Sequence, residues 1–234
     1  MALMSDAAMV LFCDVSSDTQ GHDDWHSTEH MHERLSIGGF IRGTRWIRAA
    51  GAPRYMIIYE VAGVDVAHAP QYLERLDDPT PWTTSTMKRL RGMSRGFCRI
   101  AASAGYGLGH AACALRFRVA DDEARRELIR DVPRMAAWRG MASVHLLEPE
   151  ASPPMTKEQS IRGADAGMSS VLLLTAYDAQ DLRRVCDRHL DEESLARYGI
   201  TPLDRGSYEL GFTATSAEVS RTPMSRPGQP RRAP

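Results

Sequence analysis

The sequence lacks paired cysteines, long hydrophobic runs and an excess of charge of one sign. Its four cysteines (Cys13, Cys98, Cys113 and Cys186) are far apart and form neither a CxxC pair nor a zinc-ribbon spacing. No apolar run approaches the roughly 18 residues needed to span a bilayer. The N-terminus has no basic region of the kind that opens a signal peptide. These absences exclude a disulfide scaffold, and we expect a soluble protein of the cytoplasm.

The charge balance also excludes some classes of partner. Lys and Arg total 29 against 30 Asp and Glu in 234 residues, so the formal net charge is −1. Such a balance does not favour nucleic acid or an anionic membrane as a partner. The chain also has no serine nucleophile elbow and no Walker motif. Its 43% hydrophobic and 25% charged residues are typical of a globular protein.

Apolar runs and helical stretches follow one order that occurs twice along the chain. The first half predicts strands over 8–14, 40–48, 54–61 and 96–103, and helices over 22–35, 65–76 and 82–92. The second half predicts strands over 111–119, 141–147, 169–177 and 207–213, and helices over 121–138, interrupted at Pro133, and 180–196. Residues 149–167 are expected to form a long polar loop. The repeat rests on the order of elements, because identity between the halves is slight.

A β-α-β-β-α-β unit predicts a four-stranded antiparallel sheet with both helices on one face, the ferredoxin-like arrangement. The bare face of such a sheet is apolar and needs a partner, which a second copy supplies. We therefore predict an α+β fold with two ferredoxin-like units in tandem, whose sheets pack into an α/β barrel. The expected units are 1–104 and 110–216, joined by a glycine-rich linker at 105–109 and followed by a disordered tail at 217–234.

Four of the eight histidines lie within eleven residues: His22, His26, His30 and His32. On a helix, steps of four residues stay on one face, so His22, His26 and His30 form a stripe that Arg34 continues. An imidazole titrates near neutrality and exchanges protons at working pH. A helix packed on a sheet normally shows more apolar positions than this one. The sequence therefore favours a helix whose imidazoles line a cavity.

Carboxylates follow these histidines at helical spacing. Glu29 comes three residues after His26, and Glu33 comes three residues after His30, so each imidazole has a carboxylate within reach. We expect His30 to act as general base or acid, with His26 as a second proton carrier. Glu29 or Glu33 would orient the imidazole. An arginine, Arg34 or Arg45, would hold an enolate or carboxylate. The predicted catalytic residues are His30, His26, Glu29, Glu33 and Arg34.

A second set of side chains is expected to contact the substrate. Trp82 follows a rigid loop in which Thr80 is a helix cap and Pro81 takes the first helical position. His145 lies on a second-half strand and is expected to reach the pocket from the other unit. The predicted substrate-binding residues are His22, Trp25, Arg45, Tyr59, Trp82 and His145.

The segment from His26 to His30 also matches HxxEH, the motif of inverted zinc peptidases. In that interpretation His26 and His30 bind zinc and Glu29 acts as the base. A third ligand would come from Glu60, His68 or Glu74. This alternative stays open, although a motif with three fixed positions has a high rate of chance matches in a histidine-rich stretch.

The same segment resembles the EthD-like branch of the dimeric α/β-barrel superfamily. The resemblance rests on an acidic-Trp start, a Glu-His pair, an Arg-Leu pair, a Gly-Phe pair and an Arg-aromatic strand: Asp24-Trp25, Glu29-His30, Arg34-Leu35, Gly39-Phe40 and Arg45-Trp46. Gly38 stands where the family usually has proline. The resemblance covers residues 8–104 and is only topological over 110–215. It implies two ferredoxin-like units per barrel, here fused, and a small-molecule pocket between sheet and helices.

That superfamily includes cofactor-independent monooxygenases, lactone isomerases, polyketide cyclases and haem proteins. We predict a cofactor-independent acid–base enzyme of the isomerase or lyase type, acting on a small catabolite with a carbonyl or carboxylate group. Three alternatives stay open: a zinc-dependent hydrolase, an oxygenase or haem protein, and a non-catalytic small-molecule binding module. No cofactor is expected, and dimerisation of the fused chain is left open.

Overall fold

The computed structural model describes residues 2–151 and 156–222. The first half contains β1 Ala7–Val15, α1 Thr19–Trp25, the π-helical turn η1 His26–His30, α2 Met31–Leu35, β2 Phe40–Arg48, β3 Tyr55–Val61, the 3₁₀ turn η2 Val64–His68, α3 Pro70–Asp77, α4 Pro81–Met87 and β4 Leu90–Gly105. The second half contains β5 Ala111–Val119, α5 Asp122–Ala136, β6 Met141–Ala151, α6 Lys157–Arg162, β7 Ser170–Ala176, α7 Ala179–His189, α8 Glu192–Arg197, β8 Ile200–Thr215 and α9 Ser216–Arg221.

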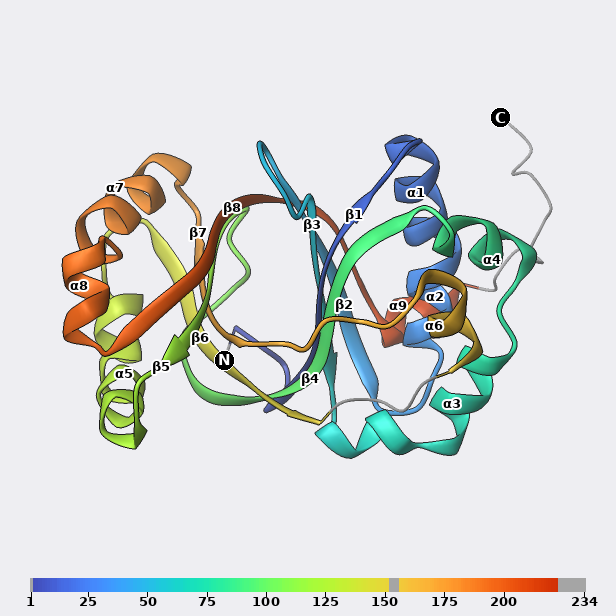
Figure 1. The fold of residues 1–234 in the computed structure, drawn as a ribbon, viewed down its shortest axis with the longest axis horizontal. Coiled ribbons are helices and arrows are strands. Elements are labelled where there is room, and N and C mark those ends of the chain that lie inside the picture. Colours follow the sequence, from blue (N-terminus) through green and yellow to red (C-terminus); the bar gives the residue numbers. More distant parts are fainter. Residues whose placement is uncertain (1, 152–155, 223–234) are drawn as a thin grey trace.

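The strands form one closed antiparallel barrel in the order β1-β3-β2-β8-β5-β7-β6-β4 (Figure 1). Each half contributes four neighbouring strands, and the halves join where β2 pairs with β8 and β4 pairs with β6. Two long strands make these joints. The first part of β4 pairs with β1, and its last part pairs with β6. The predicted fold class, two ferredoxin-like units whose sheets form an α/β barrel, is confirmed.

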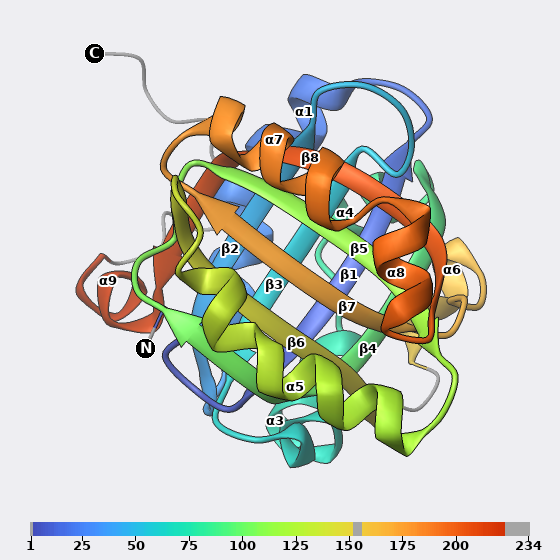
Figure 2. The ribbon, with the colours of Figure 1, turned by 90° about the vertical axis from the view of Figure 1, so that its left-hand side faces the viewer.

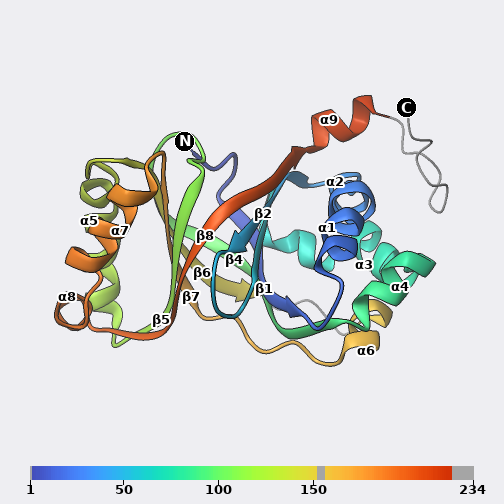
Figure 3. The same ribbon diagram turned by 90° about the horizontal axis from the view of Figure 1, so that it is seen from above.

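The helices lie outside the barrel in two groups at opposite ends. Helices α5, α7 and α8 cover the second-half strands, as Figure 2 shows. Helices α1 to α4 cover the first-half strands together with α6 and α9, which come from the second half of the chain (Figures 1 and 3). None of the helices within the described residues is long and apolar enough to cross a membrane.

Successive side chains of a strand point to opposite faces of the sheet, so the apolar side chains form three layers. One lies inside the barrel, one lies under the first-half helices (the first helix layer), and one lies under the second-half helices (the second helix layer). On β3, Met56 and Ile58 point into the barrel, whereas Tyr55, Ile57 and Tyr59 point toward the first-half helices. The second helix layer, built mainly from leucine and valine, covers the other half. β3 is therefore buried on both faces along its whole length.

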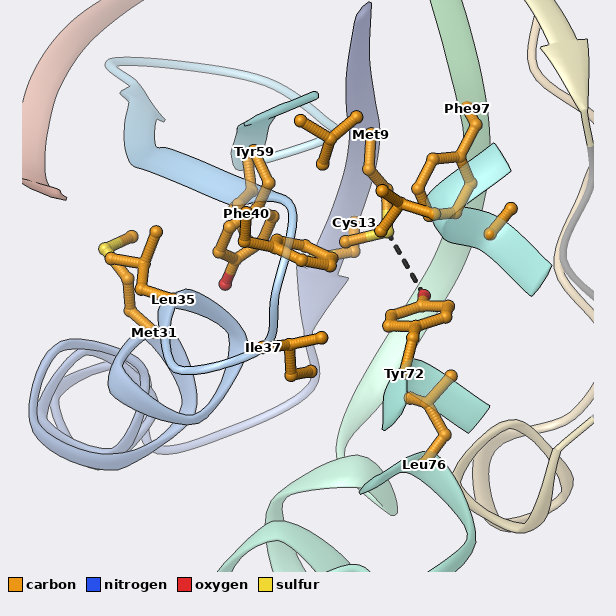
Figure 4. Close-up of a cluster of buried hydrophobic side chains, with 14 of the residues drawn as sticks. Met9, Cys13, Met31, Leu35, Ile37, Phe40, Tyr59, Tyr72, Leu76 and Phe97 are labelled. Atoms are coloured by element: carbon orange, nitrogen blue, oxygen red, sulfur yellow. Dashed lines mark hydrogen bonds between the residues drawn. The ribbon is translucent and has the colours of Figure 1, made fainter. Parts of the chain in front are cut away.

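The first helix layer is rich in aromatic and sulfur side chains, as Figure 4 shows. The ring of Phe40 stacks on that of Tyr72, with centroids 5.6 Å apart. The Tyr72 hydroxyl donates to the Met9 sulfur at 3.3 Å. This packing forms the base against which the histidine-bearing helix is held.

Several expected boundaries differ from the structure. The helix expected over 22–35 begins at Thr19 and includes the π turn, and α5 continues through Pro133 without interruption. Strands expected over 96–103 and 207–213 are the middle parts of β4 and β8. The additional residues at the start of each strand pair within their own half, with β1 and β5 respectively, and those at the end pair with β6 and β2 of the other half. Pairing with distant strands extends a strand beyond what its local pattern indicates.

Two segments expected to be irregular contain helices. The polar loop expected over 149–167 contains α6, and the tail expected from 217 begins with α9, which ends at Arg221. Each helix starts with a capping box, Thr156 with Gln159 and Thr215 with Glu218. The remainder of the tail, 223–234, and residues 152–155 of the expected loop lie outside the described residues.

Residues 106–110 connect β4 to β5 and overlap the glycine-rich linker expected over 105–109, of which Gly105 is the last residue of β4. Gly109 has a φ of +36°, and a Cβ built there would lie 2.3 Å from the carbonyl oxygen of Ala176. Only glycine fits this close approach to the β7 backbone. The glycines at this position therefore serve the connection between strands.

Candidate active site

The helical segment from Thr19 to Leu35 carries the histidine stripe. Asp18 caps it by accepting from the Gly21 N–H, and in its middle the Met31 N–H donates to the His26 carbonyl across a π turn. Such π turns occur frequently at functional sites. The side chains of His22, His26 and His30 are buried, with exposed fractions of 1%, 1% and 8%. All three line one hollow between this helix and the first-half sheet, which we call the imidazole hollow.

The imidazole hollow contains about 430 Å³ of space not filled by atoms, counted to its open mouth. Only about 30 Å³ of it accepts the centres of water molecules, which is room for one or two waters. Met9, Met87 and Met93 form part of its wall. Methionine side chains are flexible, so this wall can adapt to a ligand.

Both ring nitrogens of His26 have partners. Arg45 Nη1 donates to His26 Nδ1 at 3.3 Å, and the Tyr59 hydroxyl lies 3.1 Å from His26 Nε2. A guanidinium only donates, so Nδ1 is the unprotonated nitrogen and Nε2–H faces the Tyr59 oxygen. Arg45 also donates to Ser27 Oγ and pairs with Asp23. Arg45 therefore fixes His26 and does not itself line the hollow.

His30 is less engaged. Its ring stacks on Trp25, with centroids 4.3 Å apart, and Trp25 Nε1 donates to Thr83 Oγ1 at 3.1 Å. His30 Nδ1 lies 3.8 Å from a Glu33 oxygen, beyond hydrogen-bond distance, and it has no hydrogen-bond partner among the described residues. The His30 imidazole is therefore held through its ring face, and its nitrogens are less engaged in hydrogen bonds than those of His26.

Of the two carboxylates, Glu33 lies near His30, as its spacing predicted, whereas Glu29 does not lie beside His26. Glu29 accepts from Thr80 Oγ1 at 2.6 Å and from Thr83 Oγ1 at 3.3 Å, so it faces the start of α4 and does not orient His26. Glu33 pairs with Arg75. Neither carboxylate lines the imidazole hollow. Glu29 acts on the site indirectly, because it holds the Thr83 hydroxyl that contacts Trp25.

Burial sets the protonation of the imidazoles. It lowers the pKa values of His26 and His30 well below 6.5, and the positive charges of Arg45 and Arg34 respectively act in the same direction. Burial also lowers the pKa of His22, although neighbouring Asp23 opposes it. The three rings are therefore neutral at pH 7.

Arginines and carboxylates close one side of the imidazole hollow. Arg34 Nη2 donates to both oxygens of Glu158, at 2.8 and 2.6 Å. Arg95 Nε and Arg162 Nη2 donate to Asp165, at 3.0 and 2.8 Å. Glu158 and Arg162 belong to α6, so the second half of the chain completes a site in the first half. The sequence did not predict Arg95, Glu158 or Arg162 as site residues.

Two other predicted contacts are corrected. Thr80 caps α4 and Pro81 begins it, as predicted, but Trp82 is 38% exposed and does not line the hollow. His145 faces the barrel interior, where its two nitrogens lie 2.9 Å from Ser103 Oγ and Ser143 Oγ. Its position on β6 fixes it to the inner face of the sheet, so it does not reach the hollow.

The donor set does not match a zinc site. His26 uses both nitrogens on Arg45 and Tyr59, and Glu29 is engaged by two threonines. Of the proposed third ligands, Glu60 faces the barrel interior and pairs with Arg42. Within residues 2–151 and 156–222, no group of three His, Cys, Asp or Glu side chains is placed to hold a metal ion.

No family model and no curated protein matches the chain by sequence. Solved structures match it by fold. An anthrone oxidase-like protein superposes with a TM-score of 0.60 at 12% identity, covering 94% of this chain and 97% of that one. A candidate monooxygenase from Fusobacterium nucleatum subsp. nucleatum gives 0.57 at 6% identity, covering 91% and 96%. A candidate chlorite dismutase gives 0.53 at 13% identity, covering 92% and 97%. Identities this low establish a shared fold and leave the EthD-like branch as a prediction.

Proposed function

Because this chain has the fold of the dimeric α/β-barrel superfamily, with both units in one polypeptide, we propose that it is a cofactor-independent acid–base enzyme. Its substrate is a small molecule with an enolisable carbonyl group, and its first step removes a proton beside that carbonyl. The observation that carries this proposal is the stripe of buried, neutral imidazoles facing one hollow. A neutral imidazole is the form that accepts a proton.

His30 is the proposed base. It lines the hollow, its Nδ1 is unpartnered among the described residues, and Trp25 fixes its ring plane. A base acts from within hydrogen-bond reach of the proton that it removes. His26 lacks this freedom because both of its nitrogens are engaged.

Tyr59 is the proposed donor to the oxygen that becomes negative. His26 Nε2–H points at the Tyr59 oxygen, so the Tyr59 proton is not used on His26 and is free for a ligand. The chain of contacts from Arg45 through His26 to Tyr59 fixes this direction. A preorganised donor in a site with little water stabilises an enolate more strongly than water does.

Oxidation by O₂ is a second outcome of the same first step. It is favoured by the descriptions of two matched structures, an anthrone oxidase-like protein and a candidate monooxygenase. Anthrone, for example, reacts through its enolate with O₂ to give anthraquinone and water, the water taking up the proton that the base removed.

The test measures exchange of carbon-bound hydrogen with D₂O. Anthrone and a panel of 2-oxo acids serve as probes, with deuterium uptake followed by mass spectrometry and O₂ uptake followed with an electrode. We expect His30→Gln to slow exchange by about 10²–10⁴-fold, the usual contribution of a positioned acid–base group. His189→Gln is the matched control, because His189 stacks on Trp138 in the second half, also with centroids 4.3 Å apart.

Wild-type exchange that is lost in His30→Gln and kept in His189→Gln supports the proposal. Exchange that survives His30→Gln assigns the chemistry elsewhere, and absence of exchange across the panel rejects an enolising enzyme for these substrates. Uptake of O₂ in step with exchange selects the oxidase outcome over isomerisation or elimination.

A further inference from the structure

The buried charges beside the imidazole hollow do not balance. Arg34, Arg95 and Arg162 carry three positive charges, and Glu158 and Asp165 carry two negative charges. Their side chains are at most 9% exposed. A buried charge without a counter-charge is costly, so a net charge of +1 at this place calls for an explanation.

Two donors of this cluster are also unused. Arg34 Nη1 and Arg95 Nη2 are buried and have no hydrogen-bond partner among the described residues. Both side chains line the hollow. An unsatisfied buried donor destabilises a fold, and a ligand group that accepts a hydrogen bond from it removes that cost.

Neighbouring charges do not cancel the excess. Two other carboxylates of the helix are buried: Glu33, which pairs with Arg75, and Glu29, whose partners are the neutral hydroxyls of Thr80 and Thr83. Asp23 pairs with Arg45, which also contacts His26. Both ion pairs are internally balanced, and Glu29 faces the start of α4 and does not line the hollow, so the side chains at the hollow keep one excess positive charge.

We propose that this cluster is a binding subsite for the carboxylate of a monoanionic substrate, with Arg34 Nη1 and Arg95 Nη2 as its donors. Arg162 supplies the third positive charge, and Glu158 and Asp165 hold the three guanidinium groups in place. This inference rests on the proposed function for the identity of the ligand as substrate, and it narrows the substrate to a small enolisable carboxylic acid.

The subsite also acts on the proposed base. The positive charge of Arg34 is one cause of the low pKa of the His30 imidazole, and Arg162 and His26 act in the same direction. An anion bound between the arginines offsets that charge and raises the pKa of His30. The substrate therefore makes its own base stronger when it binds.

The test compares carboxylates with neutral molecules of the same shape. Acetate is paired with acetamide and benzoate with benzamide, and binding is measured by calorimetry and by the shift in melting temperature that a ligand produces. We expect the carboxylates to bind and the amides not to bind at concentrations up to about 10 mM, well above the dissociation constant of a specific weak ligand. Inorganic phosphate, with its higher charge, is expected to bind more weakly than acetate.

Arg95→Gln is the informative variant. It removes one donor and the excess charge, while Asp165 keeps its contacts with Arg162 and Gln159. We expect the affinity for benzoate to fall at least tenfold, and the rise in the pKa of His30 on adding benzoate, followed by NMR, to disappear. The matched control is Arg99→Gln, four residues further on β4, where the side chain is 47% exposed and pairs with Glu148.

Equal binding of benzoate and benzamide, no carboxylate binding at all, tighter binding of phosphate, or unchanged affinity in Arg95→Gln would each overturn the subsite. If Arg95→Gln does not fold, the comparison of carboxylate with amide on the unaltered protein decides. These readouts need no turnover. A subsite that binds carboxylates in a protein without exchange activity leaves this inference standing as a binding site and rejects only the enzymatic proposal.

Discussion

The two halves share one topology but differ in how the first helix of each meets its sheet. In the second half, α5 buries Leu128, Val132 and Met135. In the first half, the corresponding helix presents His22, His26 and His30. Apart from Asp181 and Ser194, the described buried residues of the second helix layer are apolar.

This difference shows that the fold does not require the same interface twice. The barrel interior and the second helix layer each contain a cluster of buried apolar side chains, so the first layer tolerates a polar hollow. The candidate site is a local set of side chains, whereas the topology is shared by both halves.

The largest expected effect comes from breaking the buried ion pair of the first half. Arg34→Ala leaves Glu158 charged and unpaired in the interior, and we expect a loss of about 3–5 kcal/mol in the free energy of unfolding. Urea denaturation measures it. Arg134→Ala removes an exposed pair with Asp131 in the second half and should cost less than about 1 kcal/mol. Equal costs for the two variants would contradict the contrast between the halves.

Acid should destabilise the protein through its buried neutral histidines. Burial, with a contribution from Arg42, lowers the pKa of His145 from 6.5 to about 4. Between pH 6.5 and about 4, the unfolded chain binds a proton at His145 that the folded chain does not bind. The contribution of His145 to stability is therefore fully present above pH 6.5 and decreases as the pH falls toward about 4. The expected loss from His145 is about 3 kcal/mol.

Calorimetry from pH 7 to pH 4 measures this loss, and His145→Gln separates the two halves. The free energy of unfolding should depend less steeply on pH in that variant, but it should still depend on pH, because His22, His26 and His30 have lowered pKa values too. A flat profile in His145→Gln would mean that the first-half imidazoles do not stay neutral in the folded protein.

The smallest expected effect makes the first half resemble the second. His30→Met replaces a buried polar ring by an apolar side chain and should raise the free energy of unfolding by about 0.5–2 kcal/mol while abolishing exchange activity. Urea denaturation and deuterium uptake on the same sample test both parts. A strong loss of stability would show that His30 is needed for packing rather than for chemistry.

The sequence revealed the features that depend on local spacing. Apolar runs located all eight strands of the barrel, and the period of four placed His22, His26 and His30 on one face. Contacts between segments far apart in the sequence could not be predicted from this spacing. Glu29 meets Thr80 and Thr83 about fifty residues away, which no helical spacing indicates.

Two other features of the site have a local sequence signal, a capping box and an alternating strand pattern, from which they could have been predicted. Thr156 and Gln159 form a capping box, which marks the start of α6 and hence of the segment that carries Glu158 and Arg162. Met9, Leu11 and Cys13 alternate along β1 and share the face that lines the hollow. Arg95 had no such signal, because its partner Asp165 is supplied by the other half.

The reach of α6 across the barrel has a consequence for stoichiometry. A barrel assembled from two identical chains has twofold symmetry and offers every site in duplicate. Here one repeat carries the histidines and the other lends Glu158 and Arg162 to them, so the symmetry is lost. Each polypeptide should then saturate at one carboxylate in this hollow, along a simple hyperbolic curve.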